Sequence, residues 1–151
     1  MKFKKIKLFL LIFFLCSNLN AIENKILIKI NNEIITTLDI YDELKYLKAL
    51  NPKIQELDDQ TSLEVSKNSV IREKIKEIGI LRERQNIEGK DELLEKQIEN
   101  IYLNIGLKSI EEFKDYLNNS GLTINFVKKK INIEMAWNDL IVSKFRSKVI
   151  I

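Results

Sequence analysis

The chain has 151 residues, enough for one ordinary domain with its own core but too few for two full domains and a targeting segment. It carries 25 basic residues, 22 acidic residues and no histidine. The absence of imidazole excludes the Ser-His triad and most zinc sites, and no glycine-rich phosphate loop occurs, so the sequence predicts no enzyme, no cofactor and no metal.

The first predicted element is a secretory signal peptide. Four lysines among the first seven residues precede an apolar run from Leu8 to Cys16, and Ala21 supplies a small residue for cleavage. The run is shorter than the roughly 20 apolar residues that span a bilayer. We therefore expect cleavage near Ala21, which makes residues 1–21 the signal peptide and residues 22–151 the exported domain.

Removal of the signal peptide changes the charge of the protein. Residues 1–21 hold four of the 25 basic residues and none of the 22 acidic ones, so the mature chain has a net charge of −1. Such a chain has no net positive field to attract nucleic acid. The one basic run, Lys128–Lys130, is interpreted as a solvated helix face. The only cysteine, Cys16, leaves with the leader, so no disulfide is expected.

Residues 26–35 have the pattern of a short β-hairpin. Isoleucines alternate with other residues at 26–30, and a second apolar pair follows at 34–35. Asn31 and Asn32 between them tolerate the positive φ of a tight turn. Because an isolated hairpin is marginal in water, we expect it to pack on helices or gain another strand.

A first helix is predicted from Thr36 to about Asn51. Thr36 is followed three residues later by Asp39, a variant of the capping box, and apolar residues then continue at helical spacing. Pro52, the only proline, is expected to open a polar loop that runs through Gln60.

A second helix is predicted after this loop, with one glycine inside it. Its expected inner face consists of Val70 or Ile71, Ile75, Ile78 and Leu81. Gly79 costs about 1 kcal/mol relative to alanine inside a helix. We therefore expect another helix to cross close to Gly79.

A third helix is predicted to end at Gly106. Its apolar positions are Leu93, Leu94, Ile98 and Ile101. Gly106 is followed by Leu107, which is typical of a left-handed glycine stop with an apolar residue behind it. Ser109 stands three residues before Glu112, a capping box that predicts a new helix start.

A short helix and a long helix complete the pattern. The short helix places Ile110, Phe113 and Leu117 on one face and ends at Gly121. Thr123 then offers an N-cap for a long helix from Ile124 to about Phe145, whose apolar positions include Val127, Ile131, Met135 and Val142. The sequence therefore predicts a mainly α fold, a five- to six-helix orthogonal bundle with a short N-terminal β-hairpin. A generic helical core without a specific function is the plainer interpretation.

The order of these signals is more specific than a generic core. The leader, the hairpin ILIKINNEIITTLDI, the run SVIREKIKEIGILRERQNI and the stretch from Gly106 to Trp137 together resemble the N-terminal domain of the SurA family of periplasmic chaperones. The most specific part is Gly106 to Trp137, with two glycine stops around a short capped helix and then a long helix with a central tryptophan. The resemblance covers roughly residues 26–149.

The resemblance implies a function and a location. Members of the family act in the periplasm and escort unfolded outer-membrane proteins, so the expected partners are unfolded or extended polypeptide segments rather than nucleic acid or a small-molecule substrate. Complete members continue into parvulin domains, whose prolyl isomerase activity is associated with a histidine-containing pocket. This sequence contains neither, so isomerase activity is not expected.

Four apolar side chains of the long helix are candidate peptide contacts: Phe126, Met135, Trp137 and Ile141. The resemblance implies the activity and not these positions, and each residue type is more often part of a core than of a ligand site.

Two other classes of function stay open. One is a structural or membrane-tethered helical module whose apolar face is buried by one dedicated protein partner. The other is a hydrolase that uses only carboxylates, although the acidic residues mostly alternate with lysines, as on a solvated surface. A homodimer is also predicted, because a second copy can fill the apolar groove that the family covers with a C-terminal helix.

Overall fold

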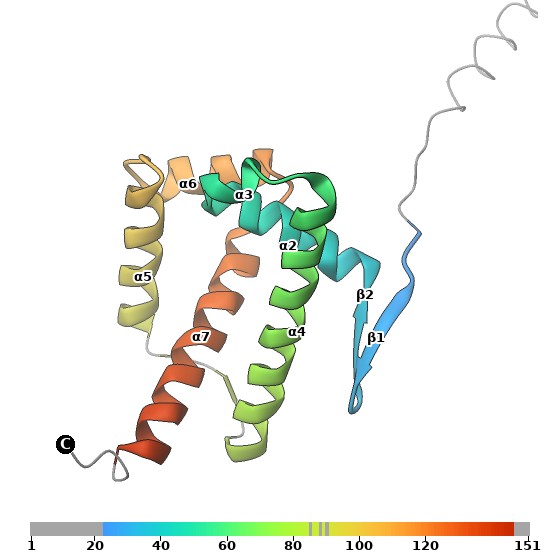
Figure 1. Ribbon diagram of the computed structural model, residues 1–151. Coiled ribbons are helices and arrows are strands. Elements are labelled where there is room, and N and C mark those ends of the chain that lie inside the picture. The colour runs from blue at the N-terminus through green and yellow to red at the C-terminus, as the bar shows by residue number, and fades with distance from the viewer. Residues whose placement is uncertain (1–22, 85, 88, 90, 147–151) are drawn as a thin grey trace, which may run out of the picture.

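The structure is a computed structural model that describes residues 23–84, 86–87, 89 and 91–146. The predicted signal peptide, residues 1–21, lies outside the described residues. The described part consists of a two-stranded antiparallel hairpin and six helices, labelled as in Figure 1. The strands and helices are β1 (Ile26–Ile30), β2 (Glu33–Thr36), α2 (Thr37–Leu50), α3 (Pro52–Gln55), α4 (Asp59–Glu83), α5 (Asp91–Asn104), α6 (Ile110–Asn119) and α7 (Ile124–Phe145). The predicted mainly α fold with an N-terminal hairpin is confirmed.

The long helix α7 lies between α4 and α5 (Figure 1). Helix α2 packs against α4, and the hairpin lies beside α2 and α4 on the side away from α5. Three clusters of buried side chains join these elements. The largest lies between α2, α5, α6 and α7, with Phe113, Leu117 and Val127 fully buried. A second joins α4 to α7 around Ile80 and Ile133, and a third joins the hairpin to α2 and α4.

The hairpin packs on the helices, as predicted, because an isolated two-stranded hairpin is only marginally stable in water. Asn31 takes a φ of 55° in its turn, which confirms the predicted positive φ for one residue of the asparagine pair. Ile35 of β2 is fully buried against Ile40 and Val70. The hairpin therefore forms part of the domain core.

The N-terminal caps follow the predicted residues. Thr36 and Asp39 form the full capping box: the Thr36 amide donates to the Asp39 carboxylate at 2.7 Å, and the Asp39 amide donates to the Thr36 hydroxyl at 3.3 Å. Thr123 accepts from the amide of Phe126 and caps α7. At α6, Ser109 accepts from the Glu112 amide, but the Glu112 carboxylate accepts from the Lys108 amide, one residue before the cap.

The two glycine stops are confirmed. Gly106 and Gly121 take φ values of 85° and 70°, which glycine adopts without the clash of a Cβ atom. In each case the next residue closes the helix end: the amide of Leu107 donates to the Tyr102 carbonyl, and the amide of Leu122 donates to the Leu117 carbonyl, both at 2.9 Å. These stops turn the chain so that α6 lies across the ends of α5 and α7.

The prediction of a loop from Pro52 to Gln60 is wrong. Pro52 is the first residue of the short helix α3, with the Asn51 side chain as its cap, and α4 already begins at Asp59 with Asp58 as its cap. Proline suits the first helical position because its missing N–H has no partner there in any case.

The predicted inner face of α4 is correct only in part: Val70 is buried and Ile71 and Ile78 are half-buried, but the other two positions do not face inward. Ile75 and Leu81 are about half exposed, at 51% and 49%. The inward stripe runs instead through Ser62, Ser66, Val70, Glu73, Glu77 and Ile80. Most of these positions are polar, so hydrophobic periodicity alone identified Val70 but not the rest of the stripe. Leu93 of α5 and Val142 of α7 are likewise exposed rather than inward.

Gly79 confirms the predicted close approach of two helices. A Cβ atom added at this position would lie 3.0 Å from Cζ3 of Trp137 on α7. The indole therefore occupies the space that a side chain at Gly79 would need, and it packs beside the cluster formed by Ile80 and Ile133.

Candidate functional site

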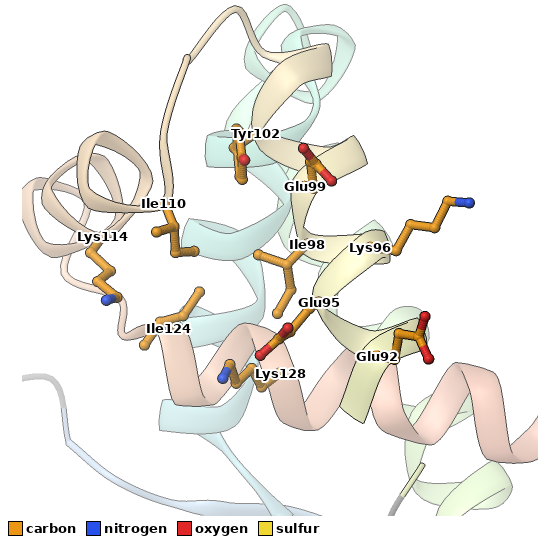
Figure 2. A pocket seen from close by; sticks show the side chains of 10 residues that line it. All are labelled: Glu92, Glu95, Lys96, Ile98, Glu99, Tyr102, Ile110, Lys114, Ile124 and Lys128. Carbon is orange, nitrogen blue, oxygen red and sulfur yellow. The ribbon is translucent and has the colours of Figure 1, made fainter. Parts of the chain in front are cut away.

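An open groove lies between α5 on one side and α6 with the start of α7 on the other (Figure 2). It has a volume of about 700 Å³. Its floor is apolar and its rims are charged. The lining residues are Glu92, Glu95, Lys96, Ile98, Glu99 and Tyr102 of α5, Ile110 and Lys114 of α6, and Ile124 and Lys128 of α7. We call this feature the charged groove.

The helical spacing of α5 separates floor from rim. Ile98 points into the core and is only 2% exposed, while Glu95 and Glu99 flank it on the outer side of the same helix. On the opposite side of the groove, the Gly106 stop and the Ser109 cap set the start of α6. This start places Ile110 among the apolar residues that line the groove.

The two rims carry opposite charge. Glu92, Glu95 and Glu99 stand on α5, and Lys114 and Lys128 stand on α6 and α7. Figure 2 shows the side chains of Glu95 and Lys128 pointing toward one another across the groove, whereas Lys96 points away from it.

None of the six charged side chains that line the groove forms an ion pair with another described residue. The ion pairs of the described chain lie elsewhere, many of them between α4 and α7: Lys76 with Glu134, Arg84 with Asp139, Lys129 with Glu77 and Lys144 with Glu83. The rims of the charged groove therefore present carboxylates and ammonium groups that the fold leaves available to a ligand.

A buried ionic cluster lies beneath the crossing of α2, α4 and α7. The ammonium group of Lys130 contacts the Glu43 carboxylate at 2.5 Å and also pairs with Glu73. The same group lies 5.0 Å from the ring centroid of Tyr46 and 5.4 Å from that of Phe126. Lys130 is 6% exposed and Glu43 is 1% exposed.

This cluster corrects the interpretation of Lys128–Lys130 as a solvated face. Lys128 lines the charged groove and Lys129 is exposed, but Lys130 belongs to the core. One signal was present in the sequence: Lys130 stands next to the buried Ile131 and three residues after the buried Val127, on the apolar stripe of the helix. A buried charge must be paired, so such a position predicts acidic partners on neighbouring helices.

The cluster changes the acidity of Tyr46. Burial first of all, together with the nearby carboxylates of Glu43, Glu73 and Glu134, raises the pKa of its phenol to about 12.

The four candidate peptide contacts are not brought together. Phe126 is half-buried and packs edge-to-face on Tyr46, with ring centroids 6.0 Å apart. Met135 is half-buried against the cluster around Phe113, and Trp137 packs on Gly79. Ile141 alone is exposed. Phe126 and Met135 line separate cavities, and none of the four lines the charged groove.

Sequence reasoning did not find the charged groove. It treated the lysines and glutamates of α5 and α6 as ordinary solvated residues, and only the tertiary packing of α5 against α6 and α7 places them around a common cavity. Ile98 and Ile110 were recognised, but as core positions.

The described residues contain no group of three or more His, Cys, Asp or Glu side chains placed to hold a metal ion. Within the same residues, no helix combines the length and apolar character needed to cross a membrane. Comparison of the chain with family models, with curated proteins and with solved structures finds no match.

Proposed function

We propose that this protein is a SurA-like, chaperone-type domain of the periplasm that binds unfolded or extended polypeptides, outer-membrane proteins among them, without catalysis or a cofactor. The observation that carries the proposal is the charged groove, because an apolar floor between unpaired charges suits polypeptide segments that mix apolar and charged residues. The sequence resemblance supplies the class of client and the compartment.

The expected mechanism is reversible shielding. At about 25 cal/mol per Å², burial of about 300 Å² of apolar surface supplies about 7 kcal/mol, most of which the entropy of association offsets. Binding of this strength covers a segment and still releases it. Exposed aliphatic side chains add further surface for weak contacts: Leu81, Leu93, Leu103, Ile141 and Val142.

An aggregation assay tests the proposal. Purified protein without residues 1–21 should suppress the aggregation of a urea-denatured β-barrel membrane protein at near-stoichiometric ratio. It should leave X-Pro isomerisation at its uncatalysed pace of tens of seconds. Failure to suppress aggregation, while the protein remains folded by circular dichroism, would reject the proposed function. Clear acceleration of isomerisation would reject the non-catalytic mechanism.

The proposed location has its own test. Mass spectrometry of the protein from the periplasmic fraction should find a new N-terminus within a few residues of Ile22. An intact Met1 terminus in the membrane fraction would instead support the membrane-tethered alternative.

A further inference from the structure

The charge order of the groove restricts what it can bind. The α5 rim carries Glu95 and Glu99, and the facing rim carries Lys114 and Lys128, with the apolar floor between them. A complementary ligand therefore has cations along one edge, anions along the other and apolar groups in the middle. A ligand with the same charge on both edges meets repulsion on one side.

A client segment that stays extended in the groove does not match this arrangement. Each edge of an extended backbone alternates N–H donors and C=O acceptors. The α5 rim offers mainly carboxylate acceptors and the opposite rim offers only ammonium donors, so about half of the backbone groups on each edge would lack a complementary partner. The groove is also lined by helices, which provide no free strand edge for pairing.

A helix has no such conflict, because its backbone groups are satisfied internally. The α5 rim extends from Glu92 to Tyr102, about 15 Å at 1.5 Å per residue, which is the length of about three helical turns. Apolar residues at helical spacing on such a segment form a stripe along the floor, and the residues on either side of that stripe reach the two rims.

We propose that the charged groove binds an amphipathic helical segment of about three turns, with Lys or Arg on the edge that faces α5 and Asp or Glu on the edge that faces Lys114 and Lys128. The inference rests on the proposed function: the segment belongs to an unfolded client and becomes helical in the groove. The groove then selects clients by the order of their charges as well as by their apolar content.

Three synthetic peptides test the selectivity. All share one apolar stripe on a helix-favouring sequence. The mixed peptide carries Lys on one edge and Glu on the other, and the two control peptides carry only Lys or only Glu on both edges. Fluorescence anisotropy at low salt should show the mixed peptide binding about tenfold more tightly than either control, because two like-charge contacts are avoided. Equal binding of all three peptides would overturn the proposal.

Charge reversal of one rim tests the assignment of the residues. The double variant Glu95→Lys/Glu99→Lys should lose about tenfold in affinity for the mixed peptide and should prefer the all-Glu peptide instead. The matched control is Glu111→Lys/Asp115→Lys, which reverses two exposed acidic residues of α6 outside the groove and should keep the preference of the wild type. Circular dichroism should show folded protein in both variants, since the reversed residues are exposed. An unchanged preference in the first variant, or a changed one in the control, would overturn the proposal.

The outcomes separate this inference from the proposed function. If the wild type suppresses aggregation but does not distinguish the peptides, the charge-selective helix site is rejected and the chaperone function stands. If the protein without peptide is a dimer that only the Glu95→Lys/Glu99→Lys variant dissociates, the occupant of the groove is a second copy and the client proposal is rejected.

At 0.5 M salt the preference for the mixed peptide should shrink severalfold, because exposed charges are then screened.

Discussion

Lys130 shows at the scale of one residue how this domain places a charge in its interior. The ammonium group is buried between the carboxylates of Glu43 and Glu73 and the rings of Tyr46 and Phe126. Desolvation of three charges costs several kcal/mol per ion, and only close pairing offsets it. The cluster joins α2, α4 and α7 at one point, so its geometry constrains how the three helices cross.

Removal of the buried cation should be strongly destabilising. Lys130→Met leaves two carboxylates close together with no counter-charge, which should lower the free energy of unfolding by about 3–5 kcal/mol in urea denaturation. The matched control is Lys129→Met. Lys129 is mostly exposed and lies 3.4 Å from Glu77, so its loss should cost less than about 1 kcal/mol. Similar costs for the two substitutions would contradict the burial of Lys130.

The raised pKa of Tyr46 predicts a pH dependence at the same cluster. An unfolded tyrosine ionises near pH 10, whereas Tyr46 in the folded protein ionises near 12. Because the folded-state pKa is the higher one, the contribution of Tyr46 to stability is fully present below about pH 10 and is lost as the pH rises toward 12.

This loss can be measured by urea denaturation between pH 9 and 11.5. Each unit of pH above 10 should cost the wild type up to about 1.4 kcal/mol more than it costs the Tyr46→Phe variant, which has no phenol to ionise at this position. Parallel curves for the two proteins would show that Tyr46 does not titrate differently in the folded and unfolded states.

The α4–α7 pair shows how two elements share space. Glycine at position 79 has a lower helix propensity than alanine would have. The ring of Trp137 fills the space that a side chain at position 79 would occupy. Ion pairs such as Lys76 with Glu134 and Arg84 with Asp139 then flank this contact along the helices. Helices α4 and α7 can approach closely at this point because Gly79 has no side chain. The ion pairs on either side of the contact hold the two helices in the same alignment.

A double-mutant cycle tests the contact between Gly79 and Trp137. Gly79→Ala in the wild type should lower the stability by about 1 kcal/mol, because overpacking against the indole outweighs the gain in helix propensity. In a Trp137→Ala background the same change should raise the stability by about 1 kcal/mol, because only the gain in propensity remains.

The sign change of Gly79→Ala between the two backgrounds is the decisive result, and thermal unfolding followed by circular dichroism measures it. The same effect of Gly79→Ala in both backgrounds would show that the glycine is merely tolerated in α4.

For the whole molecule, the distribution of paired and unpaired charge separates two regions. The α4–α7 side is joined by ion pairs along its length, while the α5–α6 side keeps its charges around an open groove. Exposed apolar side chains lie toward the C-terminal ends of α4 and α7, where Lys144 pairs with Glu83. Each region therefore offers a different kind of surface to a partner.

Self-association is predicted at the exposed apolar side chains near the C-terminal ends of α4 and α7. Leu81, Ile141 and Val142 are exposed there, and a second copy of the chain can cover them. Analytical ultracentrifugation at micromolar concentration should show a dimer that Val142→Glu weakens at least about tenfold. Leu103→Glu, at an exposed leucine of α5, serves as the matched control and should leave the dimer intact. A monomer at all concentrations would reject the prediction.

The bounds of most elements could be predicted because the signals that set them are local. The capping box of Thr36 and Asp39, the Thr123 cap and the positive φ of Gly106 and Gly121 each involve groups within a few residues of one another. Such interactions are nearly the same in any surrounding fold. The exception is Pro52, where a proline that suits the first turn of a helix was taken as the start of a loop.

The face that each helix turns inward depended on partners far away in the chain. Ser62 and Ser66 of α4 are buried although they are polar, and Glu73 is turned inward because Lys130, 57 residues later, neutralises it. The charged groove depends in the same way on how α5 packs against α6 and α7. Thus local sequence determined where helices begin and end in this protein. Tertiary structure decided which charges are buried and which remain open to a ligand, because the cost of burying a charge is set by groups that only the fold brings within reach.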